Sequence, residues 1–362
     1  MKNQLTKVSL FLLLFSNTCF SQYQYTQPKK LDDGWQTSDL KSKNIDSTRI
    51  YALFNQLHGE KHQVHSMLVF KNNELLVEEY FGDNAIDKPH DIRSVNKSIR
   101  AILLGIAIDK EIIKSVDDPI SNYLKDLKPK KNLDPRKEQI TIKDLITMST
   151  GLECNDWDKN SKGQEDRVYK KSNWLQYTLD LPQVNDPGTV SNYCSMGTLI
   201  LAKIIENASG MTLAEFAEKQ LFKPLEITNI QWGHTSEKKI ISAGKRLYMT
   251  SRDLGKIGQL ILNNGIWDGR QVVSETWLNE MLSVKTTITG IPYGYLWWEI
   301  PIQTKEGSTI SKTATGNGGQ YIMVFPDSNI IAIFTGGAYN SPNDKLPFAI
   351  VKDIVLPAFD KK

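Results

Sequence analysis

Hydrophobic positions near the start of the chain follow first a helical and then a strand-like spacing. Residues 47–57 (STRIYALFNQL) place apolar side chains three and four positions apart, which predicts an amphipathic helix after Asp46. Residues 65–71 and 74–81 are short apolar runs on either side of two asparagines, a pattern typical of a β-hairpin. This part of the chain is therefore expected to supply one helix and two paired strands.

A longer, buried helix is predicted directly after Ser94. Residues 92–109 read IRSVNKSIRAILLGIAID, and their apolar positions recur with helical spacing, so one side of the helix faces a core. This apolar stripe consists of Val95, Ile99, Ile102, Leu103 and Ile106.

The middle of the chain, residues 110–235, is helical in character and rich in loops. Thr141 is placed to cap a short helix, and a helix over 195–209 closes on Gly210. From residue 250 onward the pattern predicts capped helices, then strands, then a last helix that prolines interrupt. These helices are expected at 250–265, 274–282 and 344–359, and the strands at 293–300, 308–315, 320–326 and 329–337.

Strand patterns at both ends of the chain, with helices between them, predict an α+β fold. We expect an antiparallel sheet that is built from the N- and C-terminal segments and flanked by helices. An all-helical subdomain would be inserted at about residues 110–235.

Residues 1–21 predict a signal peptide. Lys2 and Lys7 precede an apolar run at 8–15 that is too short to span a bilayer. Small residues follow this run and would allow cleavage before Gln22. Cleavage would make the protein periplasmic or secreted, with no stable membrane span. A retained N-terminal anchor is the alternative.

Composition narrows the class of protein. The 362 residues are 40% hydrophobic and 23% charged, which is enough for a large buried core. The net charge of +3 argues against nucleic acid or an anionic membrane as the main partner. Residues 22–45 are polar and aperiodic, which predicts a tether or a surface-wrapping segment before a domain at 46–360.

Ser94 and Lys97 are three residues apart, so they share one face of the predicted helix. A lysine in a partly desolvated site has a lowered pKa and can accept or relay a serine proton, and the free N–H groups at a helix N-terminus suit an oxyanion. The same Ser-x-x-Lys spacing occurs at Ser38, Ser236 and Ser242, and a serine in front of a helix is often only a cap.

Two further motifs accompany Ser94. Tyr193 and Ser195 form a Tyr-x-Ser motif in front of a helix, and residues 314–327 (ATGNGGQYIMVFPD) are a glycine-rich turn that leads into a strand. The order Ser-x-x-Lys, Tyr-x-Ser and glycine-rich strand edge resembles the serine hydrolase superfamily of class C β-lactamases and D,D-peptidases.

Other stretches extend this resemblance over roughly residues 60–340. DLITMSTGL (144–152) and MTSRDLGKIGQLIL (249–262) look like family segments. YGYLWW (293–298) and GNGGQ (316–320) are most similar to the esterase and 6-aminohexanoate-dimer hydrolase branch.

The resemblance implies a β-lactamase/transpeptidase-like fold and a site that uses no cofactor and no metal. Ser94 would attack a carbonyl carbon, while Lys97 and Tyr193 would together act as the general base. Ser195 would replace the family's asparagine and hold Lys97 and the substrate. The backbone N–H groups of Ser94 and Gln320 would form the oxyanion hole.

Two departures from the family pattern bear on the substrate. Asn317, Gly318 and Gly319 stand where the family has Lys-Thr-Gly, so the cation that helps to hold a penicillin carboxylate is missing. Lys312 on the preceding strand is a candidate replacement. Met148 stands where the family has a histidine.

Cys154 and Cys194 are the cysteines that would remain after signal cleavage. The resemblance puts both of their loops on the same cleft, so an exported protein would allow a disulfide here. Two small buried thiols are the alternative.

Two other patterns could indicate a functional site but also have ordinary structural explanations. His58, His62 and His65 have spacings that could suggest a metal site, but they fall between a helix end and a strand, where solvated histidines are expected instead. Trp297 and Trp298 could line a cleft, or could alternate on a strand with one ring in the core.

The function expected from these patterns is an exported serine hydrolase that cleaves an ester or amide through an acyl-enzyme on Ser94. A small-molecule ester, amide or peptide would be the substrate. A D,D-peptidase or β-lactamase acting on peptidoglycan-type or β-lactam substrates is one alternative. A non-catalytic protein that binds peptidoglycan or peptides is another.

Overall fold

The computed structural model describes residues 25–233, 246–305 and 307–359. The signal peptide predicted at 1–21 lies outside these ranges. Within them, no helix combines the length and the apolar character that a membrane span needs.

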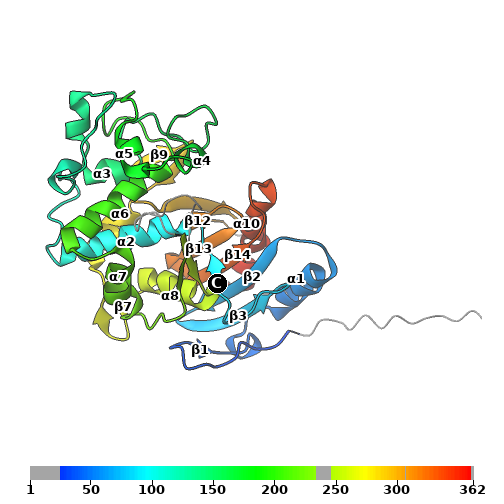
Figure 1. Ribbon diagram of the computed structural model, residues 1–362. Coiled ribbons are helices and arrows are strands. Elements are labelled where there is room, and N and C mark those ends of the chain that lie inside the picture. The colour runs from blue at the N-terminus through cyan, green and yellow to red at the C-terminus, as the bar shows by residue number, and fades with distance from the viewer. Residues whose placement is uncertain (1–24, 234–245, 306, 360–362) are drawn as a thin grey trace, which may run out of the picture.

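A nine-stranded sheet runs through the middle of the molecule (Figure 1). Its strands are β1 (Gln36–Thr37), β2 (Val64–Lys71), β3 (Glu74–Tyr80), β9 (Thr286–Ile288), β10 (Ile291–Tyr293), β11 (Trp298–Gln303), β12 (Ser308–Gly316), β13 (Gln320–Phe325) and β14 (Ile330–Gly336). They lie in the order β1-β3-β2-β14-β13-β12-β11-β10-β9. The N-terminal hairpin meets the C-terminal strands where β2 pairs antiparallel with β14, so the predicted α+β sheet built from both chain ends is confirmed. The short β1 departs from the antiparallel pattern and pairs parallel with β3.

Helices cover both faces of the sheet (Figure 1). On one face lie α1 (Ser47–Gly59), α10 (Leu346–Ile350) and α11 (Leu356–Phe359), and on the other lie α2 (Val95–Asp109) and α8 (Ser251–Leu262). α1 begins where predicted, because the Asp46 carboxylate accepts a hydrogen bond from the Thr48 N–H. A Cβ on Gly255 would lie 2.4 Å from the Phe70 ring, so glycine allows α8 to pack this closely on the sheet.

The insertion at about 110–235 contains one long helix, several short helices and long loops. Its helices are α3 (Ile142–Ile146), α4 (Glu165–Val168), α5 (Trp174–Leu179), α6 (Ser195–Ser209) and α7 (Leu213–Ala217). A second, small sheet has the order β4-β6-β5, with β4 (His90–Asp91), β5 (Gln231–Gly233) and β6 (Arg246–Met249). The prediction of an all-helical insertion was therefore wrong, because β5 lies within it and takes its partner from outside. β7 (Ile266–Trp267), β8 (Arg270–Gln271) and α9 (Glu275–Leu282) complete the α-helices and β-strands of the described residues.

The N-terminal segment before α1 wraps against the domain. Trp35 is buried, its ring centroid lies 4.3 Å from that of Phe70, and its Nε1 donates a hydrogen bond to the Arg252 carbonyl. Of the two interpretations of residues 22–45, the described part is a surface-wrapping segment and not a free tether.

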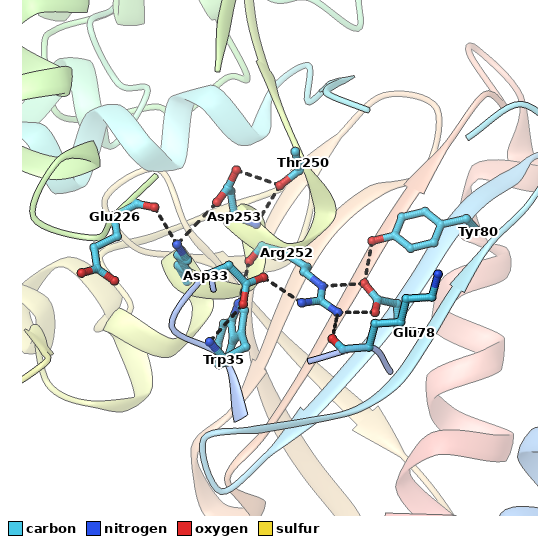
Figure 2. Close-up of polar contacts among 10 residues, drawn as sticks. Asp33, Trp35, Glu78, Tyr80, Glu226, Thr250, Arg252 and Asp253 are labelled. Carbon is cyan, nitrogen blue, oxygen red and sulfur yellow. Dashed lines mark hydrogen bonds and ion pairs between the residues drawn. The ribbon is translucent and has the colours of Figure 1, made fainter. Parts of the chain in front are cut away.

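Arg252 at the start of α8 fastens this segment to the sheet (Figure 2). Its guanidinium lies 2.7 Å from the Asp33 carboxylate and 2.6 Å from that of Glu78 on β3. Tyr80 also donates to Glu78. Because Arg252 is only 3% exposed in its side chain, both ion pairs are shielded from water.

Candidate active site

Ser94 immediately precedes α2 and faces Lys97 one turn along the helix. The Ser94 side chain makes no capping hydrogen bond; instead Lys97 Nζ donates to Ser94 Oγ over 2.7 Å. The cap interpretation of Ser94 therefore fails, and the two groups make the contact expected of a nucleophile and a residue that activates it. Of the other Ser-x-x-Lys serines, Ser38 lies on the N-terminal wrapping segment, and Ser236 and Ser242 fall outside the described residues.

Tyr193 joins this pair from the insertion. It lies just before α6, which packs on α2, and its ring centroid is 5.2 Å from Lys97 Nζ. Ser94 and Tyr193 line one cavity of about 860 Å³, to which Trp298 and Asn317 also contribute. The structure thus brings together residues from three distant parts of the chain.

The pKa of Lys97 is raised above its ordinary value. Burial alone would lower this pKa because it disfavours the ammonium, but Tyr193, Glu165 and Asp156 together raise it by more. The expectation that partial desolvation would lower the pKa of Lys97 was wrong. Because a raised pKa favours the ammonium form of Lys97, this side chain is suited to stabilise negative charge, which leaves the Tyr193 oxygen as the candidate proton acceptor.

Asp156 and Glu165 are site residues that the sequence patterns did not reveal. Asp156 accepts a hydrogen bond from the Ser195 N–H over 2.7 Å, and Glu165 accepts one from the Ser195 hydroxyl over 3.3 Å. Burial, and then the neighbouring Glu165 charge, raise the pKa of Asp156 to about 6. The hydroxyl of Ser195 is thus engaged by a carboxylate, whereas it was expected to hold Lys97.

The glycine-rich turn contributes less to the cavity than expected. Asn317 lines it, but its side-chain amide exchanges two hydrogen bonds with Asn340, at 2.8 and 2.9 Å. Gln320 is fully buried at the start of β13, where its side chain bonds both backbone groups of Gly336. Neither Gln320 nor its two preceding glycines, Gly318 and Gly319, is among the residues that line the cavity in the described part of the chain.

The end of β12 approaches Ser94 instead. Thr315, Gly316 and Asn317 all line the cavity, and a Cβ on Gly316 would lie 2.6 Å from the Ile92 carbonyl. A side chain at position 316 would therefore collide with the segment that leads into Ser94. The second oxyanion donor predicted at Gln320 is better sought among the backbone N–H groups at this end of β12.

Lys312 does not replace the missing cation. Its ammonium forms an ion pair with Glu299 and donates to the Leu282 carbonyl, and it is absent from the described cavity wall.

The two neighbouring tryptophans lie in different environments. Trp297 is buried and its Nε1 donates to the Ser98 carbonyl, whereas Trp298 lines the cavity. The Leu296 backbone, with φ 60°, makes the turn that starts β11 at Trp298 and not at residue 293.

A disulfide joins Cys154 to Cys194, whose Cα atoms lie 5.5 Å apart. The bridge spans 40 residues of sequence and ties the loop before α4 to the residues that precede α6. Two residues further on, the Asp156 N–H donates to the Tyr193 carbonyl over 2.8 Å. The loop that supplies Asp156 is therefore held against Tyr193 by a covalent and a hydrogen bond.

Each of the three N-terminal histidines contacts other side chains. His58 lies 3.1 Å from Glu79, His62 packs edge-on against Phe81, and His65 contacts His90. In the described ranges no group of three or more His, Cys, Asp or Glu side chains is placed to hold a metal ion.

The Beta-lactamase family model matches residues 53–351 of the chain. A 6-aminohexanoate-dimer hydrolase of Paenarthrobacter ureafaciens is 26% identical over 231 residues, which cover 60% of this chain and 57% of that protein.

Solved structures agree with the family match. EstCE1, a hydrolase with promiscuous acyltransferase activity, superposes with a TM-score of 0.67 at 13% identity and covers 85% of this chain and 98% of its own. A class C beta-lactamase gives a TM-score of 0.64 at 15% identity, over 89% and 97% of the two chains. At these identities the likeness shows a shared fold, and together with the family match it means that the chain belongs to the beta-lactamase family and is a hydrolase of the β-lactamase/transpeptidase-like fold.

Proposed function

We propose that this protein is an exported serine hydrolase that cleaves an ester or amide through an acyl-enzyme on Ser94. The observation that carries the proposal is the 2.7 Å hydrogen bond between Lys97 Nζ and Ser94 Oγ on the wall of a cavity that Tyr193 shares. Pure binding has no need of an activated serine, which argues against a non-catalytic role. The names of two relatives, a 6-aminohexanoate-dimer hydrolase and a hydrolase with acyltransferase activity, agree with acyl transfer.

In the proposed reaction Tyr193 enters as a phenolate that the Lys97 ammonium stabilises. Ser94 Oγ attacks the substrate carbonyl carbon while its proton passes to the phenolate oxygen. Tyr193 then gives the proton to the leaving group, at the oxygen of an alcohol or the nitrogen of an amine, and the acyl group stays on Ser94. Water attacks this acyl-enzyme by the reverse proton path and releases the acid.

The oxyanion would be stabilised by backbone N–H groups at two places. One is the Ser94 N–H at the start of α2, where the helix also contributes positive potential. The other is at the end of β12, which the close approach of Gly316 to Ile92 holds beside Ser94. Ser195 is held by the carboxylates of Asp156 and Glu165, whose charges also act on Lys97.

We further propose that esters and linear amides are turned over better than penicillins. Asn317 brings no charge to the position of the family's lysine, and its amide is already engaged by Asn340. A charge-assisted hydrogen bond is roughly twice as strong as a neutral one, so a penicillin carboxylate loses its usual anchor. D,D-peptidase or β-lactamase activity is the second candidate, since a class C beta-lactamase shares the fold.

A covalent serine probe tests the nucleophile. Intact-mass spectrometry after fluorophosphonate treatment should show one adduct, on the tryptic peptide that contains Ser94, and Ser94→Ala should remain unmodified. Equal labelling of the Ser94→Ala variant would refute the proposal. Side-by-side rates with p-nitrophenyl butyrate, a linear anilide and nitrocefin then rank the substrate classes, and a higher kcat/KM for nitrocefin would favour the second candidate.

A further inference from the structure

A second, smaller cavity of about 100 Å³ opens beside Ser94, and its described wall is rich in positive charge. Arg93, Lys97, Arg100 and Arg246 line it, whereas Glu165 is the carboxylate among the described lining residues. Arg93, Arg246 and Ser94 itself line both this cavity and the larger one, so the two spaces meet at the nucleophile. A volume of this size fits a small charged group and not a whole substrate.

The two arginines come from separate elements and share one acid. Arg246 on β6 donates to the Asp91 carboxylate over 2.8 Å, and Arg93 Nε lies 3.2 Å from the same oxygen. The pairing of β4 with β6 brings them together. One carboxylate thus faces two guanidiniums, each with a side chain more than a quarter exposed, which leaves donor capacity for a ligand.

The other charged side chains around the smaller cavity neutralise one another and do not neutralise Arg93 and Arg246. Lys97 is set against Glu165 and Asp156, and Arg100 donates to the Thr198 carbonyl. Glu206, which also acts on Arg100, forms an ion pair with Lys203 at 3.7 Å. The positive charge in excess therefore belongs to the Arg93–Arg246 pair.

Arg93 is held in position for such a role. Its guanidinium carbon lies 4.4 Å from the centroid of the Tyr339 ring, and Tyr339 lines the larger cavity. The Arg93 backbone has φ 51°, the left-handed region that a non-glycine residue adopts only where its surroundings enforce it. Arg93 is thereby fixed between Asp91 and Tyr339, directly before the nucleophile.

We propose that Arg93 and Arg246 form an anion subsite, and that the enzyme prefers ester or amide substrates that carry a carboxylate close to the scissile bond. The subsite rests on the proposed role of Ser94. Asn317 also lines both cavities but carries no charge, so the surplus positive charge beside Ser94 comes from the two arginines. A planar guanidinium recognises a carboxylate with paired hydrogen bonds, and two of them would hold it firmly.

Matched ester pairs test the subsite. On the acyl side, the p-nitrophenyl monoester of adipic acid is compared with p-nitrophenyl hexanoate; on the leaving-group side, meta-butyryloxybenzoate is compared with its benzamide. In native protein, at least one anionic ester should have a kcat/KM roughly ten-fold above that of its neutral partner, and salt should reduce this ratio. Arg246→Gln and Arg93→Gln should each abolish the preference, whereas Lys345→Gln, an exposed cation of the larger cavity, should keep it.

Two outcomes would overturn the subsite while leaving the nucleophile intact: equal rates on both members of each pair, or a preference that survives Arg246→Gln. Failure of Ser94 labelling, with no ester hydrolysed, would instead contradict the proposed function. Calorimetric titration with adipate tests the subsite without turnover. Native protein and Ser94→Ala should bind adipate, Arg246→Gln should bind it at least ten-fold more weakly, and equal affinities would refute the assignment.

Discussion

The ring planes of Trp157 and Tyr193 are parallel, with an interplanar angle of 0° and centroids 4.9 Å apart. Trp157 is 54% exposed, whereas Tyr193 is buried, so the indole covers the phenol from solvent. The Cys154–Cys194 disulfide and the Asp156–Tyr193 backbone hydrogen bond hold this arrangement in place. A single loop of the insertion therefore both covers the proposed base and supplies the carboxylate behind it.

Removing the Trp157 ring should impair catalysis more than stability. Trp157→Ala exposes Tyr193 to water and removes a stack worth roughly 1 kcal/mol, so we expect kcat/KM for p-nitrophenyl butyrate to fall about ten-fold. Trp157→Phe keeps an aromatic cover and should retain most activity. Equal losses in the two variants would show that the stack itself is unimportant.

Lys97 and Tyr193 should behave as one unit. Lys97→Ala and Tyr193→Phe are each expected to lower the acylation rate by orders of magnitude, and the double variant should lose little more, because residues that act together are non-additive. Stopped-flow measurement of the p-nitrophenol burst in all four proteins completes the cycle. Losses that multiply would mean that the two side chains act independently.

Asp156 should leave a signature in the pH dependence of stability. Its pKa of about 6 lies above the ordinary aspartate value, so between about pH 4 and 6 the folded protein retains a proton that the unfolded chain releases. This group therefore makes the free energy of unfolding decrease as pH rises through that window. Asp156→Asn lacks this contribution, and its stability relative to native protein should rise by up to about 3 kcal/mol from pH 4 to 7. Urea titrations at both pH values measure the difference, and a constant gap between the two proteins would contradict the assignment.

Reducing the disulfide should destabilise the protein. A bridge that closes a 40-residue loop contributes roughly 3 to 4 kcal/mol, mainly by restricting the unfolded chain. Cys154→Ser together with Cys194→Ser should lower the melting temperature and the acylation rate, because the Trp157 loop loses its covalent tie. Thiol titration of unreduced, denatured protein should find both cysteines blocked; two free thiols would rule the bridge out.

Arg252 should be the strongest tie of the N-terminal segment. Arg252→Met leaves Glu78 buried without its cation, which should cost about 3 to 5 kcal/mol. Lys43 makes a comparable tie to Glu74, but with a side chain 40% exposed, so Lys43→Met should cost less than about 1 kcal/mol. Chemical denaturation compares the two variants, and similar costs would show that burial of the Arg252 network is unimportant.

Features that depend on neighbouring residues were predictable from the sequence. α1, the β2–β3 hairpin and α2 all arise from local spacing, and each formed where its pattern predicted. The contact between Ser94 and Lys97 also belongs here, because three residues on a helix always span one turn. The sheet built from both chain ends followed from the order of these local signals.

The tertiary structure alone decided which loops meet around Ser94. Asp156 and Glu165 lie in a stretch without periodicity, and only the packing of α6 on α2 brings them to Lys97 and reverses the expected direction of its pKa shift. Arg93 and Arg246 are far apart in sequence and meet because β4 pairs with β6. The electrostatic environment of a residue depends on distances in space, which the local spacing of residues does not encode. The nucleophile could therefore be predicted from the sequence, whereas the charged residues around it could not.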